Sequence, residues 1–467
     1  MRILLDTHIF LWYITGNSQL PPKFRAASSL WLGLLLILLT LTCEGGAFAA
    51  EWYIAPTGDD SAAGDLEHPF AGLRRAQAAA SPGDTVHVRG GKFSFTNDDL
   101  AAPRGVFARA IVLDKSGLPE RPITYAAYRD ERPVFDFTAV TPANKRVTAF
   151  YVAGSHLRLS GLDVVGVQVT MKGHTQSICF ESQGSHNVFE RLSMHDGQAI
   201  GIYHVRGSDN LFLNCDAWNN WDRTSEDGKG GNVDGFGGHP TPGSRGNVFR
   251  GCRAWHNSDD GFDCISAHEA VTFEDCLALA NGYAADKTSL ADGNGFKAGG
   301  YASLPAKDWP RPIPRHIIRR CVAVGNKNSG FYANHHPGGC DWLYNTAFQN
   351  AADFNLLGRT DDNRADIDGI GHILRNNVSF GGRRDLTRID REKCELAGNS
   401  FTLGLKLTAR DFVSLDTAEL LRPRSANGAW TEIDCLRPAA DSALVGRAVR
   451  KNPNDAADLG AFPVRTK

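Results

Sequence analysis

The sequence is short of methionine, of closely paired cysteines and of any excess of charge. Met accounts for 3 of the 467 residues, and none of the 10 cysteines belongs to a CxxC pair. The missing pairs argue against a zinc ribbon or a thioredoxin-like redox site. The 50 basic and 52 acidic residues leave a net charge of -2, which gives no global attraction to nucleic acid or to an anionic membrane. A polyanionic partner would have to be held by a local cationic patch or by a bound metal.

The one strongly apolar stretch near the start is too short for a comfortable membrane span. It runs from Leu30 to Thr42, follows Lys23 and Arg25, and leads to the small-residue stretch that ends at Ala49. A basic flank, a short apolar core and a small-residue exit are typical of a secretory signal peptide. We therefore expect residues 28–49 to be a signal peptide. The mature protein is then expected to be secreted, extracellular or periplasmic, without stable membrane association; an uncleaved anchor is the alternative.

Residues 1–27 differ in kind from the rest of the chain. The run MRILLDTHIFLW resembles the opening of PIN-domain toxin ribonucleases, in which a first strand ends in a metal-binding acid, here Asp6. A nuclease of that kind needs several carboxylates from a full domain, and the signal peptide interrupts it. We interpret this piece as a gene-fusion scar or an early start codon, and we expect residues 1–49 to be dispensable for fold and activity.

The chain also lacks a Gly/Ser or Pro linker, although it holds 49 glycines, and a repeat runs through its middle. From Phe212 on, the blocks LFLNCDAWNN, NVFRGCRAWHN, VTFEDCLALAN, HIIRRCVAVGN and DWLYNTAFQN recur, with a shortest step near 23 residues. Their aligned columns are Cys215, Cys252, Cys276, Cys321 and Asn345; Ala217, Ala254, Ala278, Ala323 and Ala347; and Asn220, Asn257, Asn281, Asn326 and Asn350. A second block follows each first one and aligns Ile202, Phe236, Phe262, Phe296, Phe331 and Phe354.

Short alternating strands in coils of this length predict an all-β protein with a parallel β-helix. The Phe, Cys and Ala columns should be buried, the cysteines reduced, and the Asn column should form a hydrogen-bonded ladder at a turn. We expect a short N-terminal cap and first coil in residues 50–100, the catalytic β-helix in residues 101–400 and a closing segment in residues 401–467.

Strand alternation then predicts a charged cluster on one outer face. If the Phe column points inward, the residue after each Phe points outward by alternation. The residue two before each Phe is expected to point outward as well. These rules bring Asp234, Asp260 and Asp263 together, with Asp259 at the adjoining turn and Lys297 one coil beyond Asp263. Four converging carboxylates without His or Cys favour calcium. The alternative for SDDGFD alone is a solvated acidic turn.

A lysine beside a cation site suits proton abstraction, because a neighbouring positive charge lowers the pKa of an ammonium group. A metal can bind a carboxylate and stabilise negative charge on the adjacent carbon. The substrate then needs a proton alpha to a carboxylate and a leaving group beta to it, and a 4-linked uronide has both.

The motifs GHTQSICF, GGNVDGFGGH, RGCRAWHNSDDGFD and GNGFKAGG resemble those of the pectate lyases of polysaccharide lyase family 9. The resemblance spans about residues 50–465. It implies a right-handed, pectin-lyase-like solenoid, calcium as cofactor, and an acidic plant-type polysaccharide as partner rather than nucleic acid. By resemblance, the calcium ligands are Asp234, Asp259, Asp260 and Asp263, and Lys297 is the base. The family includes pectate, polygalacturonate and rhamnogalacturonan I lyases, so membership leaves the substrate open.

Weaker substrate-binding candidates flank this cluster, and we expect a monomer. They are Arg253, His256, Tyr332, Asn334 and His335, with His336 and His239 nearby; each is as readily a structural residue as a sugar contact. Two other functions stay open: a β-helix glycoside hydrolase acting on pectin, and a non-catalytic carbohydrate-binding β-helix. Neither gives Lys297 a role.

Overall fold

The computed structural model describes residues 49–101 and 103–465. The expected signal peptide and the toxin-like opening fall outside these residues, apart from Ala49. In the described ranges no helix has both the length and the apolar character needed to cross a membrane. The description below concerns the unit that begins at Ala50.

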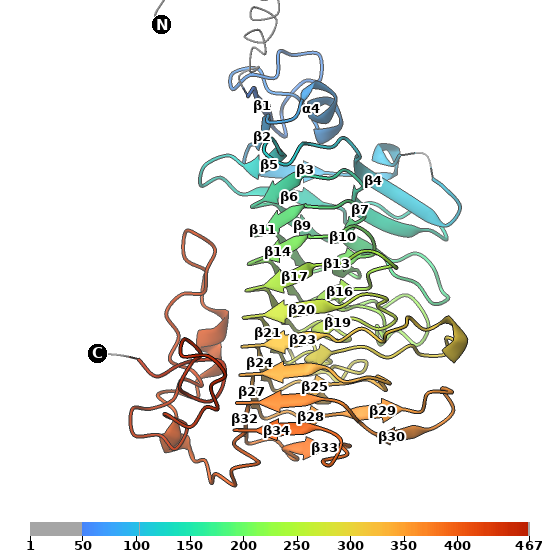
Figure 1. The fold of residues 1–467 in the computed structure, drawn as a ribbon. Coiled ribbons are helices and arrows are strands. Elements are labelled where there is room, and N and C mark those ends of the chain that lie inside the picture. The colour runs from blue at the N-terminus through green and yellow to red at the C-terminus, as the bar shows by residue number, and fades with distance from the viewer. Residues whose placement is uncertain (1–48, 102, 466–467) are drawn as a thin grey trace, which may run out of the picture. The chain divides into compact units, whose positions relative to one another are not determined.

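The unit is a stack of coils, most of which contribute one strand to each of three parallel sheets (Figure 1). Sheet I contains β1 (Glu51–Ile54), β2 (Thr85–Val88), β5 (Ile123–Ala127), β8 (Leu157–Ser160), β11 (Val188–Glu190), β14 (Leu211–Leu213), β17 (Asn247–Arg250), β20 (Val271–Glu274), β23 (Ile317–Arg319), β26 (Asp341–Leu343), β31 (Ile373–Arg375) and β34 (Glu395–Ala397). Sheet II contains β4 (Phe107–Leu113), β7 (Arg146–Val152), β10 (Ile178–Ser182), β13 (Ile200–His204), β16 (Phe236–Gly238), β19 (Phe262–Asp263), β22 (Phe296–Lys297), β25 (Ser329–Tyr332), β28 (Ala352–Asn355) and β33 (Leu386–Thr387). Sheet III contains β3 (Gly91–Ser94), β6 (Pro133–Asp136), β9 (Asp163–Val165), β12 (Ser193–His195), β15 (Asp216–Trp218), β18 (Arg253–Trp255), β21 (Leu277–Leu279), β24 (Val322–Val324), β27 (Thr346–Phe348) and β32 (Val378–Phe380).

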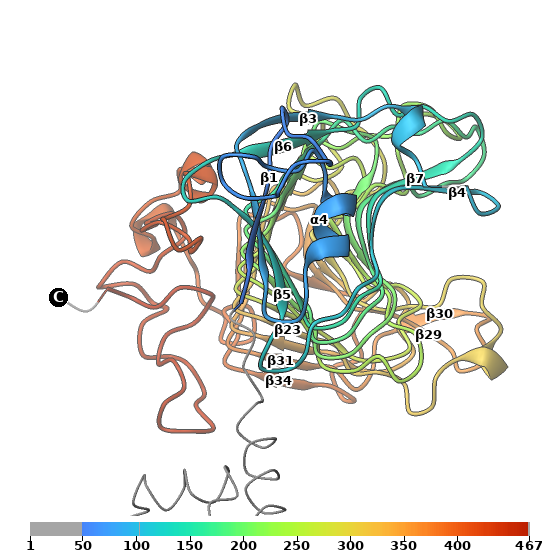
Figure 2. The same cartoon turned by 90° about the horizontal axis from the view of Figure 1, so that it is seen from above.

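Few elements depart from this plan. A side hairpin pairs β29 (Leu357–Arg359) with β30 (Asp366–Asp368) in antiparallel fashion. The short helices are α4 (Leu73–Ala79), η1 (Asn97–Asp99), η2 (Ala306–Asp308), η3 (Ala409–Asp411) and η4 (Thr417–Leu421). Figure 2, seen from above, shows the three sheets enclosing the core. The predicted right-handed parallel β-helix is confirmed.

The inner columns are those predicted from the repeats. Phe236, Phe262, Phe296, Phe331 and Phe354 are each paired in register with the next and fully buried. Their rings stack at centroid distances of 4.6 to 5.2 Å. The four column cysteines, Cys215, Cys252, Cys276 and Cys321, are buried and free. A single coil could not bury these side chains, so their burial depends on stacking.

The asparagine ladder is present at the turn between sheets III and II. Each side-chain amide from Asn220 to Asn326 donates to the side-chain oxygen of the next asparagine, at 3.0 to 3.1 Å, and the ladder reaches Asn350. The amide of Asn350 then donates to Asp353 at 2.9 Å. Fully bonded buried amides fix the register of neighbouring coils, because an unpaired one would cost about 1–3 kcal/mol.

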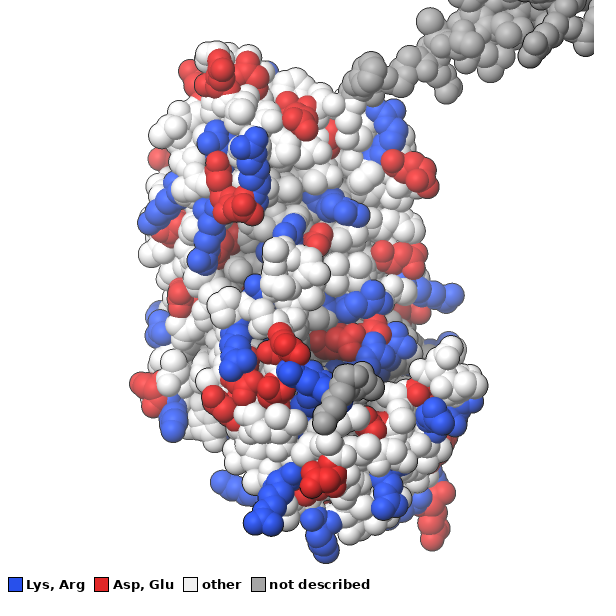
Figure 3. Space-filling view, turned by 90° about the vertical axis from the view of Figure 1, so that its left-hand side faces the viewer, with Lys and Arg blue, Asp and Glu red and all other residues white. Residues whose placement is uncertain are grey.

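The two ends of the described chain cover different parts of the solenoid. At the N-terminal end α4 buries Leu73 and Ala76 in the core. Residues after about 400 pack instead against the outer face of sheet III, where Phe412, Leu420 and Leu444 join Leu277 and Val322 in a second apolar cluster. In Figure 1 this red segment runs beside the coils rather than over the end of the stack. Figure 3, which looks onto that side, shows Lys and Arg mixed with Asp and Glu.

Candidate active site

The strand register of sheet II assembles the charged cluster. Tyr203, Gly237, Asp263, Lys297 and Tyr332 occupy equivalent outward positions on β13, β16, β19, β22 and β25. Each follows a buried Ile or Phe, so alternation turns it to the outside of the solenoid. This is the column predicted from the sequence.

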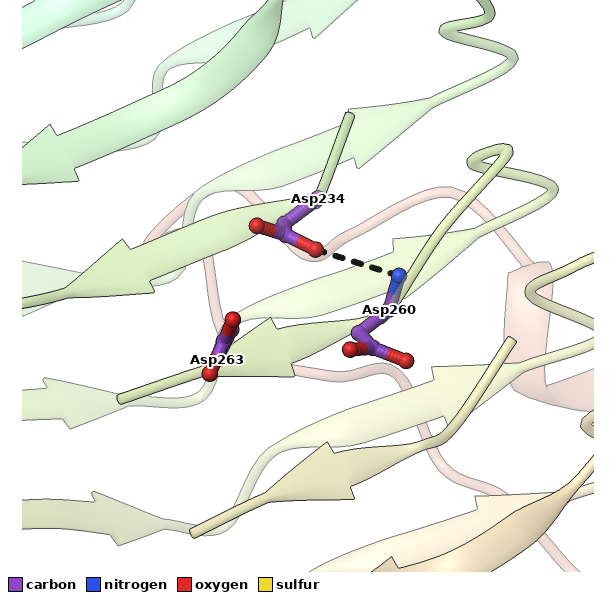
Figure 4. A group of neighbouring side chains, drawn as sticks. All are labelled: Asp234, Asp260 and Asp263. Atoms are coloured by element: carbon purple, nitrogen blue, oxygen red, sulfur yellow. Dashed lines mark hydrogen bonds between the residues drawn. The ribbon is translucent and has the colours of Figure 1, made fainter. Parts of the chain in front are cut away.

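Three carboxylates converge just before and within these strands (Figure 4). One oxygen from each of Asp234, Asp260 and Asp263 lies within 4.8 Å of the others. The backbone N–H of Asp260 donates to Asp234 Oδ1 at 3.1 Å, and both the backbone N–H and the side-chain amide of Asn294 donate to Asp260 Oδ1, at 2.7 and 2.9 Å. Ile265 N–H holds Asp263 Oδ1 at 2.7 Å. In each of the three carboxylates, Oδ1 therefore accepts a hydrogen bond from the protein, while Oδ2 accepts none of these bonds.

The cluster is buried and electrostatically strained. Asp234, Asp259, Asp260 and Asp263 are at most 5% exposed. Burial, together with the neighbouring carboxylates, holds the pKa values of Asp234 and Asp259 well above the ordinary range and raises that of Asp260. So many buried acids with one cation among them are a poor arrangement for stability and a good one for binding positive charge.

That one cation is Lys297. Its Nζ lies 3.0 Å from Asp260 Oδ2 and 3.1 Å from Asp263 Oδ2. The contact with Asp260 Oδ2 is an ion pair, and this buried oxygen has no hydrogen-bond partner in the described part of the chain. Burial alone would lower the pKa of Lys297, but the four carboxylates outweigh it and hold the pKa well above its usual value.

The donor set fits a hard divalent cation. It consists of carboxylate oxygens only, brought close by β16, β19 and the turns before them, and the buried Asp260 Oδ2 lacks a hydrogen bond. Calcium binds six to eight such oxygens in flexible geometry, and no sulfur or imidazole nitrogen belongs to the cluster. Asp259 is held at the edge of the cluster, where its Oδ1 accepts from Asp292 N–H at 3.2 Å.

His239, one of the weaker candidates from the sequence, packs beside the outward column. Its ring contacts Tyr203 at a centroid distance of 4.7 Å, and its Nδ1 is 2.7 Å from the carbonyl oxygen of Ile265. Its Nε2 is buried without a hydrogen-bond partner. A Cβ on Gly237 would lie 2.6 Å from that atom, so glycine makes room for the imidazole in the outward column. The only sequence signal for this was the glycine itself.

The weaker candidates beyond Lys297 have mixed surroundings. Tyr332 lies next to Lys297 in the column, and burial raises its pKa to about 12. Asn334 donates to the carbonyl oxygen of Gly299 at 2.8 Å, and His335 pairs with Asp366 at 2.9 Å. His336 is buried against the carbonyl oxygen of Pro314. His335 is thus engaged by a carboxylate and Asn334 by the backbone, while Tyr332 lies in the charged column itself.

The expectation that Arg253 projects near the acidic cluster is wrong. Arg253 lies on β18 of sheet III, buried, and pairs with Asp216 at 2.7 Å. Its Nη1 donates to the carbonyl oxygens of Leu420 and Arg422 in the C-terminal segment. The turn that follows β18 changes sheets, so residues a few positions before Asp259 face a different side of the molecule.

His256 also lies apart from the carboxylates. Its Nδ1 is 3.2 Å from the carbonyl oxygen of Tyr283. Together with Trp221, Arg223 and Leu290 it lines a separate cavity of about 240 Å³. This location gives it no direct part in the charged column.

Comparisons with known proteins agree with the β-helix fold. Residues 52–377 match the family described as Pel9A-like, right handed beta helix region. The chain is 32% identical to pectate lyase L of Dickeya chrysanthemi, over 88% of this chain and 90% of that protein, and 30% identical to pectate lyase L of Paenibacillus polymyxa, over 85% and 83%.

Two solved structures are similar over most of their length. One is a rhamnogalacturonan lyase, with a TM-score of 0.81 and 40% identity, covering 84% of this chain and 97% of that one. The other is pectate lyase Pel9A, with a TM-score of 0.72 and 30% identity, covering 89% and 96%.

Proposed function

Since the chain belongs to the Pel9A-like right-handed β-helix family and is a polysaccharide lyase, we propose that it is a secreted, calcium-dependent enzyme that cleaves 4-linked uronate polymers by β-elimination. The observation that carries the chemistry is the ion pairing of Lys297 Nζ with Asp260 and Asp263, at 3.0 and 3.1 Å. An amine held inside an oxygen-rich cation site has a use in proton abstraction from an acidic sugar.

Calcium would be held by Asp234, Asp259, Asp260 and Asp263. When bound, it supplies positive charge that attracts a uronate carboxylate and favours negative charge on the adjacent carbon. Binding of such an ion by the same carboxylates would also remove much of their pull on Lys297, so the pKa of the ammonium should fall. Asn294 and the N–H groups of Asp260 and Ile265 keep the carboxylates oriented for this role.

In the proposed reaction the neutral amine of Lys297 takes the proton from the carbon alpha to the carboxylate. The electron pair of that C–H bond forms a double bond to the neighbouring ring carbon. The bond from that carbon to the glycosidic oxygen breaks, and the departing oxygen takes up a proton from solvent. The products are a new chain end and an unsaturated uronide.

The residues around Lys297 support this reaction over the two alternatives. A hydrolase would use one protonated carboxyl group as acid and a second carboxylate, and would leave an ion-paired lysine between them without a task. A purely binding protein would not need Lys297 kept together with four buried acids that repel one another.

The relatives support a uronate-containing substrate and leave two candidates. They include pectate lyases and a rhamnogalacturonan lyase. We therefore propose an acidic plant-type polysaccharide, pectate or rhamnogalacturonan I, acted on by a monomer outside the cytoplasm.

The test follows the absorbance of unsaturated uronide in the ultraviolet. Polygalacturonate and rhamnogalacturonan I are each incubated with the full chain, with calcium or with excess chelator. The proposal expects absorbance to rise on at least one polymer with calcium only. New reducing ends without absorbance would indicate a hydrolase, and binding without either product would indicate a non-catalytic protein.

A further inference from the structure

Two arginines on sheet II have no acidic partner. Arg109 on β4 and Arg146 on β7 are partly buried, yet neither forms an ion pair with any residue in the described ranges. The Nε atom of each is buried and has no hydrogen-bond partner there. Most other buried or half-buried arginines of this protein are paired, as Arg253 and Arg320 are. A buried guanidinium N–H without an acceptor costs free energy unless a ligand supplies one.

Both arginines lie on the same outer face as the acidic cluster. Arg109 pairs in register with Thr148, whose hydroxyl donates to Glu181 at 3.2 Å. Glu181 in turn pairs with Tyr203, the start of the outward column that leads to Lys297. Arg146 precedes Thr148 by two positions, so it points to the same side. The outward face of sheet II is therefore continuous from the arginines to the charged cluster.

Aromatic side chains accompany the two cations. The guanidinium of Arg109 lies 3.5 Å from the ring centroid of Tyr151, which keeps the cation in place. Phe107 pairs in register with Arg146 and is 36% exposed, and its neighbour Val106 is 43% exposed. An exposed ring beside a fixed cation suits a sugar ring that carries a carboxylate.

The strands that carry these residues are the longest in sheet II. β4 and β7 have seven residues each, whereas the strands of the charged cluster have two or three. In Figure 2 they reach outward on one side of the sheet, and the β29–β30 hairpin reaches outward on another. The extra length carries Phe107 and Arg146 beyond the ends of the neighbouring strands.

We propose that Arg109 and Arg146, with Phe107 and Tyr151, form a distal subsite for a carboxylate of an acidic polysaccharide chain, on the assumption that the proposed function holds. Five strand-to-strand steps separate β22 from β7, so the subsite lies roughly 24 Å from Lys297. It would therefore bind a sugar several units along the polysaccharide chain from the sugar whose bond is cleaved. A molecule with a net charge of -2 needs such a local patch to hold a polyanion.

The experiment compares a long and a short substrate. The variant Arg109→Gln/Arg146→Gln is assayed on polygalacturonate or rhamnogalacturonan I, whichever the wild type cleaves, and on the shortest fragment of that polymer that is still cleaved. We expect KM for the polymer to rise about tenfold with kcat unchanged, and the kinetics on the fragment to stay as in the wild type. Arg158→Gln, an exposed arginine on the outer face of sheet I, is the matched control and should change neither value.

Two results would overturn the subsite. One is an unchanged KM for the polymer; the other is an equal loss on polymer and fragment, which would indicate a general disturbance of the site. If the wild type forms no unsaturated product, the proposed function fails separately. Calorimetric binding of long-chain polygalacturonate to wild type and double variant then decides the subsite, since equal affinities would exclude it.

Discussion

Two buried aspartates on different sheets, Asp216 and Asp234, have opposite electrostatic surroundings. Asp216 on β15 faces outward from sheet III, where Arg253 and Arg424 pair with it at 2.7 and 2.6 Å. These cations outweigh burial and hold its pKa below the usual value. Asp234, just before β16 on sheet II, is equally buried, but burial and three further carboxylates raise its pKa. Both carboxylates are buried, so the difference in pKa comes from the number of nearby cations. The carboxylate on sheet III is stabilised by its two arginines, whereas the acids on sheet II need a bound cation.

Replacing Lys297 should have the largest effect. We expect Lys297→Ala to lower kcat by about 10²–10⁴, which is the usual loss when a positioned base is removed, with polymer binding retained. Lys297→Arg should fail nearly as badly, because a guanidinium stays protonated. The release of unsaturated uronide measures both. Lys393→Ala, an exposed lysine, serves as control; near wild-type turnover of the arginine variant would exclude a lysine base.

Neutralising an acid on sheet II should separate stability from metal binding. In chelator, Asp234→Asn is expected to unfold at a temperature equal to or above that of the wild type, because it removes repulsion among buried carboxylates. Calcium should stabilise the wild type much more than the variant, since a ligand that binds only the folded state raises its stability. Thermal melts with and without calcium measure this; an equal calcium shift in both proteins would contradict the ligand assignment.

Removing a buried carboxylate from sheet III should instead destabilise the protein. Asp216→Ala leaves Arg253 and Arg424 buried without their carboxylate, and breaking a buried pair of this kind costs about 3–5 kcal/mol. The free energy of unfolding from denaturant titration should fall by that amount, while the specific activity of folded protein stays unchanged. A stability as high as that of the wild type would mean that the comparison between the two faces is mistaken.

The smallest effect concerns Asp353, which ends the asparagine ladder. The hydroxyl of Ser379 lies 2.6 Å from both Asp353 Oδ2 and Asp385 Oδ1 and has only one proton to share. Burial raises the pKa of Asp353 from 3.8 to about 6.

Because folding raises this pKa, the protonated acid is the form that suits the folded state. Stability should therefore fall as pH rises from about 4 to 6, and stay lower above that window. Asp353→Asn should remove the decline and stabilise the protein above pH 6 by at most about 3 kcal/mol. Denaturant titrations at several pH values measure it, and a variant with the same decline would assign it to other groups.

The sequence predicts the inner columns and the charged column for the same reason. Both follow from a period of two within strands and from one residue type repeated per coil, as in Phe262 and Phe296. These features are local, and alternation carries them from the inward-facing Phe to the outward-facing Asp263 and Lys297.

The errors arise where the chain changes sheets or where distant segments meet. Arg253 is only a few residues before Asp259, but the intervening turn moves it to sheet III. Arg253 shares its carboxylate, Asp216, with Arg424, which lies 208 residues from Asp216 in the sequence. No pattern within one coil indicates that contact. The contact of the His239 ring with Tyr203 likewise depends on the space left by Gly237, which no repeat column indicates.

The C-terminal segment that covers sheet III has a consequence for the order of folding. The residues that shield Leu277, Val322 and Phe348 come from the last part of the chain, Phe412 to Ala461. The coils can stack from the N-terminal end, yet this apolar strip stays in contact with water until the last part of the chain packs onto sheet III. During that interval other chains can bind to the exposed strip. A nonsense mutation near the end of the gene would therefore yield a solenoid with an exposed apolar surface that favours aggregation.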